Sequence, residues 1–112
     1  MADDKILSLL GFARRAGKLS MGHDAAQQAL FKKQAKLVLF CGDASQRLVN
    51  EFNVTIKKHN IKTAAVITKY TMDEISFSLG YRAGVITVND ENFSKRIVEL
   101  LKQEANANGN KS

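Results

Sequence analysis

The chain has 112 residues and a formal net charge of +6, with 17 Lys and Arg against 11 Asp and Glu. This length predicts one ordinary domain over residues 1–103 and a polar, frayed tail at 104–112. The 45% of hydrophobic residues excludes a disordered chain, and the single cysteine excludes an internal disulfide. We find neither a signal peptide nor a bilayer-spanning run, so we expect a cytoplasmic protein without a membrane partner.

The first third of the chain predicts a helix, a short edge strand and a second helix. Asp3 or Asp4 can cap the first helix, whose apolar residues recur at helical spacing and which ends at Gly17. Lys18–Met21 is expected to form the edge strand. Gly22 then opens the second helix.

The rest of the chain alternates between apolar strands and helices. The third helix is expected to end at Asn60, the fourth to begin with a capping box at Thr71, and the last to follow Asp90. The strands are expected at Leu37–Cys41, Thr63–Ile67 and Gly84–Val88. Because these runs are apolar, we expect them to be covered on both faces. The alternation predicts a three-layer α/β/α sandwich with a small mixed, mostly parallel sheet.

Residues for catalysis and metal binding are scarce. The chain has two histidines and one cysteine, and no metal-binding, nucleophile-elbow or nucleotide-binding motif occurs. Cys41 ends an apolar strand, where a core thiol is the usual case. Asp43 follows that strand, where many α/β enzymes place an acid, but a turn or cap residue explains it equally well. We expect no enzyme, no metal and no cofactor.

The start of the second helix is the first candidate binding site. A helix N-terminus presents unpaired N–H groups, which suit a phosphate or a base-edge acceptor, and Gly22 permits close approach of a ligand. Gln28 lies four residues beyond Asp24 and therefore on the same face. A plain helix start, with Asp24 favourable to the helix dipole, explains these residues equally well.

Two further features indicate a nucleic-acid partner. Between residues 14 and 36, one acid stands among six basic residues: Arg14, Arg15, Lys18, Lys32, Lys33 and Lys36. Solvated lysines would give the same pattern, but the local bias favours a phosphate-contacting patch. In the segment Gly80–Gly84, two glycines frame Tyr81 and Arg82, whose side chains stack on exposed bases. A helix stop with an exposed tyrosine is the alternative.

The runs LLGFARRAGKLSMG, at Leu9–Gly22, and SMGHDAAQQALFKKQAKLVLFCGDAS, at Ser20–Ser45, resemble the kink-turn-binding ribosomal protein family. This is the group of the archaeal protein L-seven-Ae and of L-thirty-e, and the likeness is greatest to its small bacterial YlxQ-like members. The order of elements matches up to about Lys102. The strand entry Ala35–Val38 is the most recognisable part.

The resemblance implies a mechanism of recognition. In that family the start of the second helix enters the major groove of a sharply bent RNA and reads tandem sheared G·A pairs through a Gly-x-Asn-Glu-x-x-Lys motif. The loop before the last strand covers flipped-out nucleotides, and the turn Ser45 to Arg47 makes a secondary contact. The predicted RNA-binding residues are Lys18, Gly22, His23, Asp24, Gln28, Lys32, Ser45, Gly80, Tyr81, Arg82 and Ala83.

The motif of this chain departs from that of the family. Asp24 stands in place of Asn, Ala25 in place of Glu, and Gln28 in place of Lys. We therefore infer weaker or altered kink-turn specificity with RNA binding retained. The expected partner is structured RNA, with ribosomal RNA as a candidate and in a ribosomal or translation setting, rather than DNA. We expect a monomer.

Three alternatives remain beside this interpretation. A small doubly wound domain can bind a nucleotide or phosphate near Gly42 and Asp43. A protein-interaction subunit can be basic incidentally. An RNA-recruiting domain joined to a methyltransferase is less favoured, because we expect no methyltransferase domain.

Overall fold

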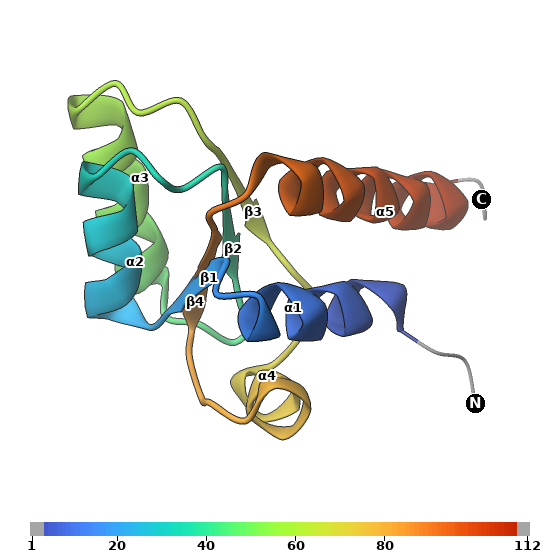
Figure 1. Cartoon of the computed structure of the whole chain (residues 1–112). Coiled ribbons are helices and arrows are strands. Elements are labelled where there is room, and N and C mark those ends of the chain that lie inside the picture. The colour runs from blue at the N-terminus through green and yellow to red at the C-terminus, as the bar shows by residue number, and fades with distance from the viewer. Residues whose placement is uncertain (1–3, 110–112) are drawn as a thin grey trace.

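The computed structural model describes residues 4–109, which form helices and strands in alternation (Figure 1). The elements are α1 (Lys5–Arg15), β1 (Leu19–Met21), α2 (His23–Phe31), β2 (Leu37–Phe40), α3 (Gln46–Lys58), β3 (Ala64–Ile67), α4 (Met72–Leu79), β4 (Val85–Val88) and α5 (Glu91–Gly109). Each predicted helix and strand is present. Within the described part of the chain, no helix combines the length and apolarity needed to cross a membrane.

Helices cover both faces of a four-stranded sheet, which confirms the three-layer α/β/α sandwich (Figure 1). Side chains alternate along β2, so that Leu37 and Leu39 pack with α1, α4 and α5, while Val38 and Phe40 pack with α2 and α3. This two-sided burial is the physical reason for the unbroken apolar run in β2.

The sheet has the order β1-β4-β2-β3 and is mixed, as predicted. The expectation that the strands of the sheet pair mostly in parallel is wrong. Only β2 and β3 pair in parallel, whereas β4 is antiparallel to both β2 and β1. The last strand, β4, lies between β1 and β2 and runs antiparallel to both. Two of the three strand pairings are therefore antiparallel.

Two further expectations differ from the structure. β3 was expected in the core, but it is an exposed edge strand in which Ile67 is 57% exposed. The polar tail was expected to fray from residue 104, but α5 continues to Gly109. Glu104 in this extension forms an ion pair with Lys69 at 3.4 Å. The last three residues of the predicted tail lie outside the described part.

The N-terminal helix is fixed at its start by a long-range contact. Asp4 caps α1 by accepting the N–H of Leu7 at 3.0 Å. The buried hydroxyl of Tyr70 donates to the same carboxylate at 2.7 Å, and this burial raises the pKa of Tyr70. Asp4 therefore caps the start of α1 and ties this helix to the β3–α4 connection, which helps to hold α1 against α4.

Candidate nucleic-acid interface

The start of α2 leaves backbone donors without a side-chain cap. Gly22 occupies the N-cap position with φ 94°, and no side chain accepts a hydrogen bond from the first turn. The N–H of Gly22 donates to the carbonyl of Val85 at 2.9 Å, which fixes this turn against β4. The first N–H groups of α2 therefore face outward, where a phosphate or a base edge can accept from them.

The loop that precedes β4 lies directly beside this helix start. A Cβ atom placed on Gly22 would lie 3.6 Å from the hydroxyl oxygen of Tyr81 and 3.7 Å from its ring. Tyr81 is 49% exposed, so the ring is open to solvent as well as close to Gly22. The helix start and the Gly80–Gly84 loop, which are far apart in the sequence, thus meet at the lower end of the sheet in Figure 1.

The loop is shaped by contacts from α4 and α1. Gly80 ends α4 in the left-handed conformation with φ 79°. The guanidinium of Arg14, near the end of α1, donates to the carbonyl of Leu79. Arg82 forms an ion pair with Asp73 in the first turn of α4. Arg14 was predicted only as a member of the basic cluster, and nothing local in the sequence indicates that it contacts this loop.

Ala83 does not offer its side chain to a ligand. It is only 5% exposed, and its carbonyl accepts a hydrogen bond from the thiol of Cys41 at 3.1 Å. Ala83 anchors the loop beside the end of β2, and its side chain is not available for the predicted RNA contact. Cys41 is a core thiol, as predicted, and burial raises its pKa to about 11, which disfavours the reactive thiolate.

His23 joins the start of α2 to α3. One ring nitrogen lies 2.9 Å from the carboxylate of Asp24 and the other 2.5 Å from that of Glu51. Hydrogen bonds to Asp24 and then to Glu51 raise the pKa of His23, and the bond from His23 lowers the pKa of Glu51. The sequence did not single out Glu51, because its partner lies on another helix.

The two adjacent glutamines of α2 differ in role. Gln28, predicted at the site, is exposed. Gln27 is partly buried, and its amide nitrogen donates to Glu51 at 3.2 Å. Gln27 thus supports the contact between α2 and α3, whereas Gln28 remains free to meet a ligand.

The turn after β2 completes this end of the molecule. Ser45 caps α3 by accepting the N–H of Leu48 at 3.1 Å, and a Cβ atom on Gly84 would lie 3.6 Å from Ala44. The carboxylate of Asp43 accepts the N–H of Met72 at 2.9 Å, at the start of α4. This contact favours the cap interpretation of Asp43 over that of a catalytic acid.

The predicted basic cluster is divided between different parts of the surface. The carbonyl of Lys18 accepts the N–H of Asn89, just beyond the end of β4 that lies away from Gly22. Lys32 follows the last residue of α2, at the other end of that helix from Gly22. Lys18 and Lys32 therefore do not lie beside the helix start, and their contact with RNA stays a prediction. In residues 4–109 we also find no group of three His, Cys, Asp or Glu side chains arranged to hold a metal.

The sequence model of the ribosomal protein L7Ae/L30e/S12e/Gadd45 family matches residues 4–98. The chain belongs to this family. The match covers most of the chain and confirms the resemblance seen in its first 45 residues.

Curated relatives of this L7Ae-type chain carry the name RNA-binding protein YlxQ. The protein from Bacillus subtilis (strain 168) is 32% identical over 101 residues, which cover 83% of this chain and 91% of the relative. The protein from Enterococcus faecium is 26% identical over 98 residues, which cover 88% of this chain and 92% of the relative.

Solved structures share the L7Ae-type fold. A protein of unknown function from Bacillus halodurans superimposes with a TM-score of 0.79 and 25% identity, over 89% of this chain and 99% of that one. The 15.5kD RNA binding protein of Giardia lamblia gives a TM-score of 0.66 at 12% identity, over 92% of this chain and 90% of that one. At that identity the second likeness concerns the fold alone.

Proposed function

We propose that the chain binds structured RNA where α2 begins, and that it recognises a sharply bent, kink-turn-like segment. The observation that carries this proposal is the closeness of Tyr81 to Gly22, which brings free helix N–H groups and an exposed aromatic ring to one surface. Membership of a ribosomal protein family and the names of the YlxQ relatives, which are RNA-binding proteins, support RNA as the ligand. Ribosomal RNA is the first candidate within this class.

The chemistry of the surface matches the usual targets of RNA-binding proteins. The N–H groups of the first turn of α2 donate to a phosphate or a base edge. The Tyr81 ring offers a stacking platform for an unpaired base, the element that bends and bulges provide. Arg82 can pair with a phosphate or a guanine after it leaves Asp73.

Asp24 gives the surface an unusual selectivity. Its carboxylate is 98% exposed at the start of α2. A carboxylate accepts hydrogen bonds from base amino groups and repels phosphate. We propose that RNA enters with an amino-bearing base edge facing Asp24, which alters the preference of the site relative to family members that carry Asn.

The test compares a bent RNA with an unbent duplex of the same composition. Tyr81→Ala is expected to reduce the preference for the bent RNA, because a lost base stack corresponds to about 1–3 kcal/mol. Arg82→Ala is expected to weaken binding by about 1–3 kcal/mol if it makes a bidentate base contact. Measurements by fluorescence anisotropy give both dissociation constants for each folded variant.

A matched control exists for Arg82. Arg96 on α5 is also half-exposed and also paired with a carboxylate, that of Glu99. Arg96→Ala removes the same charge from a distant surface and should leave the affinity for the bent RNA unchanged. Equal losses for the two arginines, or equal affinity for the bent and unbent RNA, would overturn the proposed site.

A further inference from the structure

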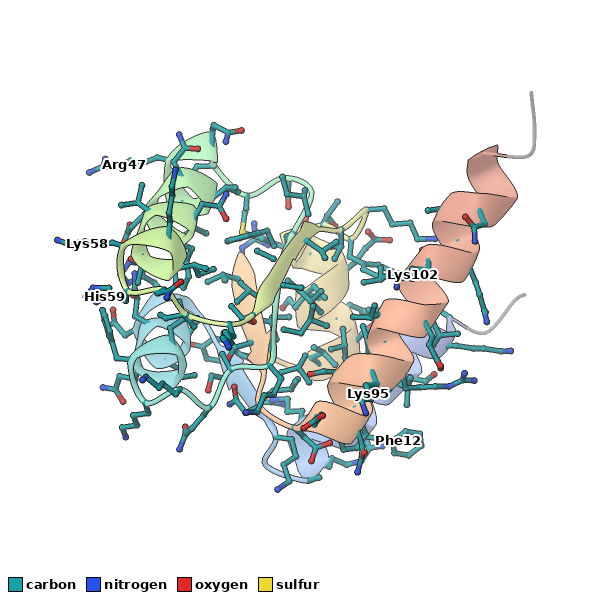
Figure 2. The ribbon with its side chains drawn as sticks, turned by 90° about the horizontal axis from the view of Figure 1, so that it is seen from above. Phe12, Arg47, Lys58, His59, Lys95 and Lys102 are labelled. Carbon is teal, nitrogen blue, oxygen red and sulfur yellow. The ribbon has the colours of Figure 1, made fainter. Side chains whose placement is uncertain are left out.

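Six of the twelve lysines of the chain lie at or just beyond the ends of α2 and α3 that are away from Gly22. This region, called here the lysine surface, consists of Lys32, Lys33, Lys36, Lys57, Lys58 and Lys62. The two helix ends are in contact, since the rings of Phe31 and His59 meet edge to face at 5.3 Å. Figure 2 shows Lys58 and His59 at this end of α3, on the opposite side of the sheet from Lys95 and Lys102 of α5.

The six lysines of the lysine surface lie together at one end of the molecule. The end with Gly22 and Tyr81 carries the carboxylates of Asp24, Asp43 and Asp73 together with the guanidinium groups of Arg14 and Arg82. Positive charge is therefore more concentrated at the lysine surface, which attracts a polyanion more strongly.

No carboxylate within residues 4–109 forms an ion pair with these lysines. The segments 25–42 and 52–72 contain no acidic residue. Glu91 and Glu99 of α5 line a hollow with Lys36 and Lys62, but they pair with Lys95 and Arg96 of their own helix. The lysine surface therefore keeps an excess of positive charge, which Glu91 and Glu99 reduce only on the side that faces α5.

Three of the lysines surround a shallow hollow, which Asn60 and Ile61 also line: Lys33, Lys36 and Lys62. Lysines in the last turn of a helix are commonly explained by the helix dipole, and this explanation suffices for Lys57 and Lys58. It does not extend to Lys36 and Lys62, which lie outside the helices. Lys33 has φ 59°, a conformation that glycine adopts more readily, so local backbone preference does not favour a lysine there.

We propose that the lysine surface binds the phosphate backbone of the RNA segment that adjoins the bend, so that the protein contacts its RNA at two ends. This inference rests on the proposed RNA-binding function. The nine residues of α2 run from one contact region to the other, a distance of about 14 Å at about 1.5 Å per residue. A stem that leaves the bend along α2 therefore reaches both regions, which favours RNA over a separate acidic protein.

The experiment compares two variants of the full chain that lose the same number of charges. The first, Lys33→Gly/Lys36→Gln/Lys62→Gln, empties the hollow of charge. The second, Lys5→Gln/Arg15→Gln/Lys69→Gln, removes three exposed cations that line neither of the two hollows beside the lysine surface. Each is titrated at several salt concentrations with a minimal bent RNA, with the same bend carrying one stem lengthened by a helical turn, and with an unbent duplex of equal length.

The first variant should lose affinity for the extended RNA by about tenfold or more at low salt, and its log–log salt slope should fall by about two units, since each neutralised phosphate contributes roughly 0.7–0.9. The first variant should bind the minimal RNA as the parent chain does, and the second variant should bind both RNAs almost as the parent chain does. Equal losses in the two variants, or none in either, would overturn the inference.

Folding and the primary site are controlled separately. Lys33→Gly alone should raise the melting temperature, because glycine relieves the left-handed backbone, while it still lowers the affinity for the extended RNA. If it lowers neither affinity nor salt slope, the inference fails even though the protein is folded. Failure of the proposed bend recognition would appear differently, as equal binding of the minimal bent RNA and an unbent RNA of the same length by the parent chain.

Discussion

Gly22 is the residue on which the proposed interface depends most directly. Its φ of 94° lies where L side chains are rare, and an added Cβ atom would stand 3.6 Å from Tyr81. We expect Gly22→Ala to cost roughly 1–3 kcal/mol of folding stability and to weaken binding of the bent RNA by at least about tenfold. Urea unfolding and anisotropy titration measure the two effects.

Gly17 provides the matched control for this substitution. Its φ is 73°, but a Cβ atom there would meet nothing within 4 Å. Gly17→Ala should therefore destabilise the fold without changing the affinity for RNA. A comparable loss of affinity in both variants would mean that backbone strain, and not the closeness of Gly22 to the ligand, explains the effect.

Cys41 contacts the Gly80–Gly84 loop through the carbonyl of Ala83 and is not expected to react with thiol reagents. It is 3% exposed, and its pKa of about 11 leaves the thiol protonated at pH 8. We expect a disulfide reagent to modify it only at the rate at which the protein opens. Cys41→Ala should cost about 1 kcal/mol of stability and leave RNA binding intact. A folded Ala variant that binds RNA poorly would show that the thiol contact to Ala83 positions the loop.

At the scale of the elements, the α2–α3 pair is linked by a bridge that depends on pH. This bridge is the hydrogen bond between His23 and Glu51. Hydrogen bonds to Asp24 and to Glu51 raise the pKa of His23 above 6.5, and the bond from His23 lowers the pKa of Glu51 below 4.5. The histidine contributes stability below pH 6.5 and loses it as the pH rises through its folded-state pKa. Glu51 contributes folding stability above pH 4.5 and loses this contribution as the pH falls through its folded-state pKa.

We therefore expect the bridge to stabilise the fold most between about pH 4.5 and 6.5, the two reference pKa values. Glu51→Gln should lower the pKa of His23 toward 6.5, while Asp24 keeps it partly raised. An NMR titration of the imidazole signals measures this change, with the His59 signals as an internal reference. An unchanged pKa of His23 in this variant would contradict the bridge.

The α4 helix begins with an unusually complete set of caps. Thr71 and Glu74 form a capping box, and Asp43 from the turn after β2 accepts the N–H of Met72. Asp43→Ala should cost about 1 kcal/mol of unfolding free energy, the typical cost of a lost cap. Asp43→Asn retains an acceptor oxygen and should keep most of the unfolding free energy that Asp43→Ala loses. Equal stability of all three proteins in urea would leave the catalytic interpretation of Asp43 open again.

At the scale of the whole molecule, the edges of the sheet favour a monomer. Both edge strands are short: β1 has three residues and β3 has four. Lys62 and Lys69 flank the exposed β3, and charged residues beside an edge strand oppose pairing with a second copy. We expect light scattering to give a mass near 12.4 kDa. A stable dimer that dissociates on Ile67→Lys would show that β3 pairs between copies.

The sequence alone determined the local features of this fold. Helical spacing, caps and apolar runs located every element, because these signals depend on neighbours a few residues away. The helix start at Gly22 and the Gly80–Gly84 loop were recognised in the same manner, from glycine placement and from residue types that suit RNA. The family resemblance added that these two segments belong together.

Only the tertiary structure decided which distant residues meet. It inserted β4 between β1 and β2, left β3 at an exposed edge, and turned Ala83 inward onto Cys41. It also separated Lys32 from Gly22 and gathered six lysines at the far ends of α2 and α3. Strand order and the burial of both sheet faces arise from packing between segments far apart in the chain, and no local pattern of residues encodes them.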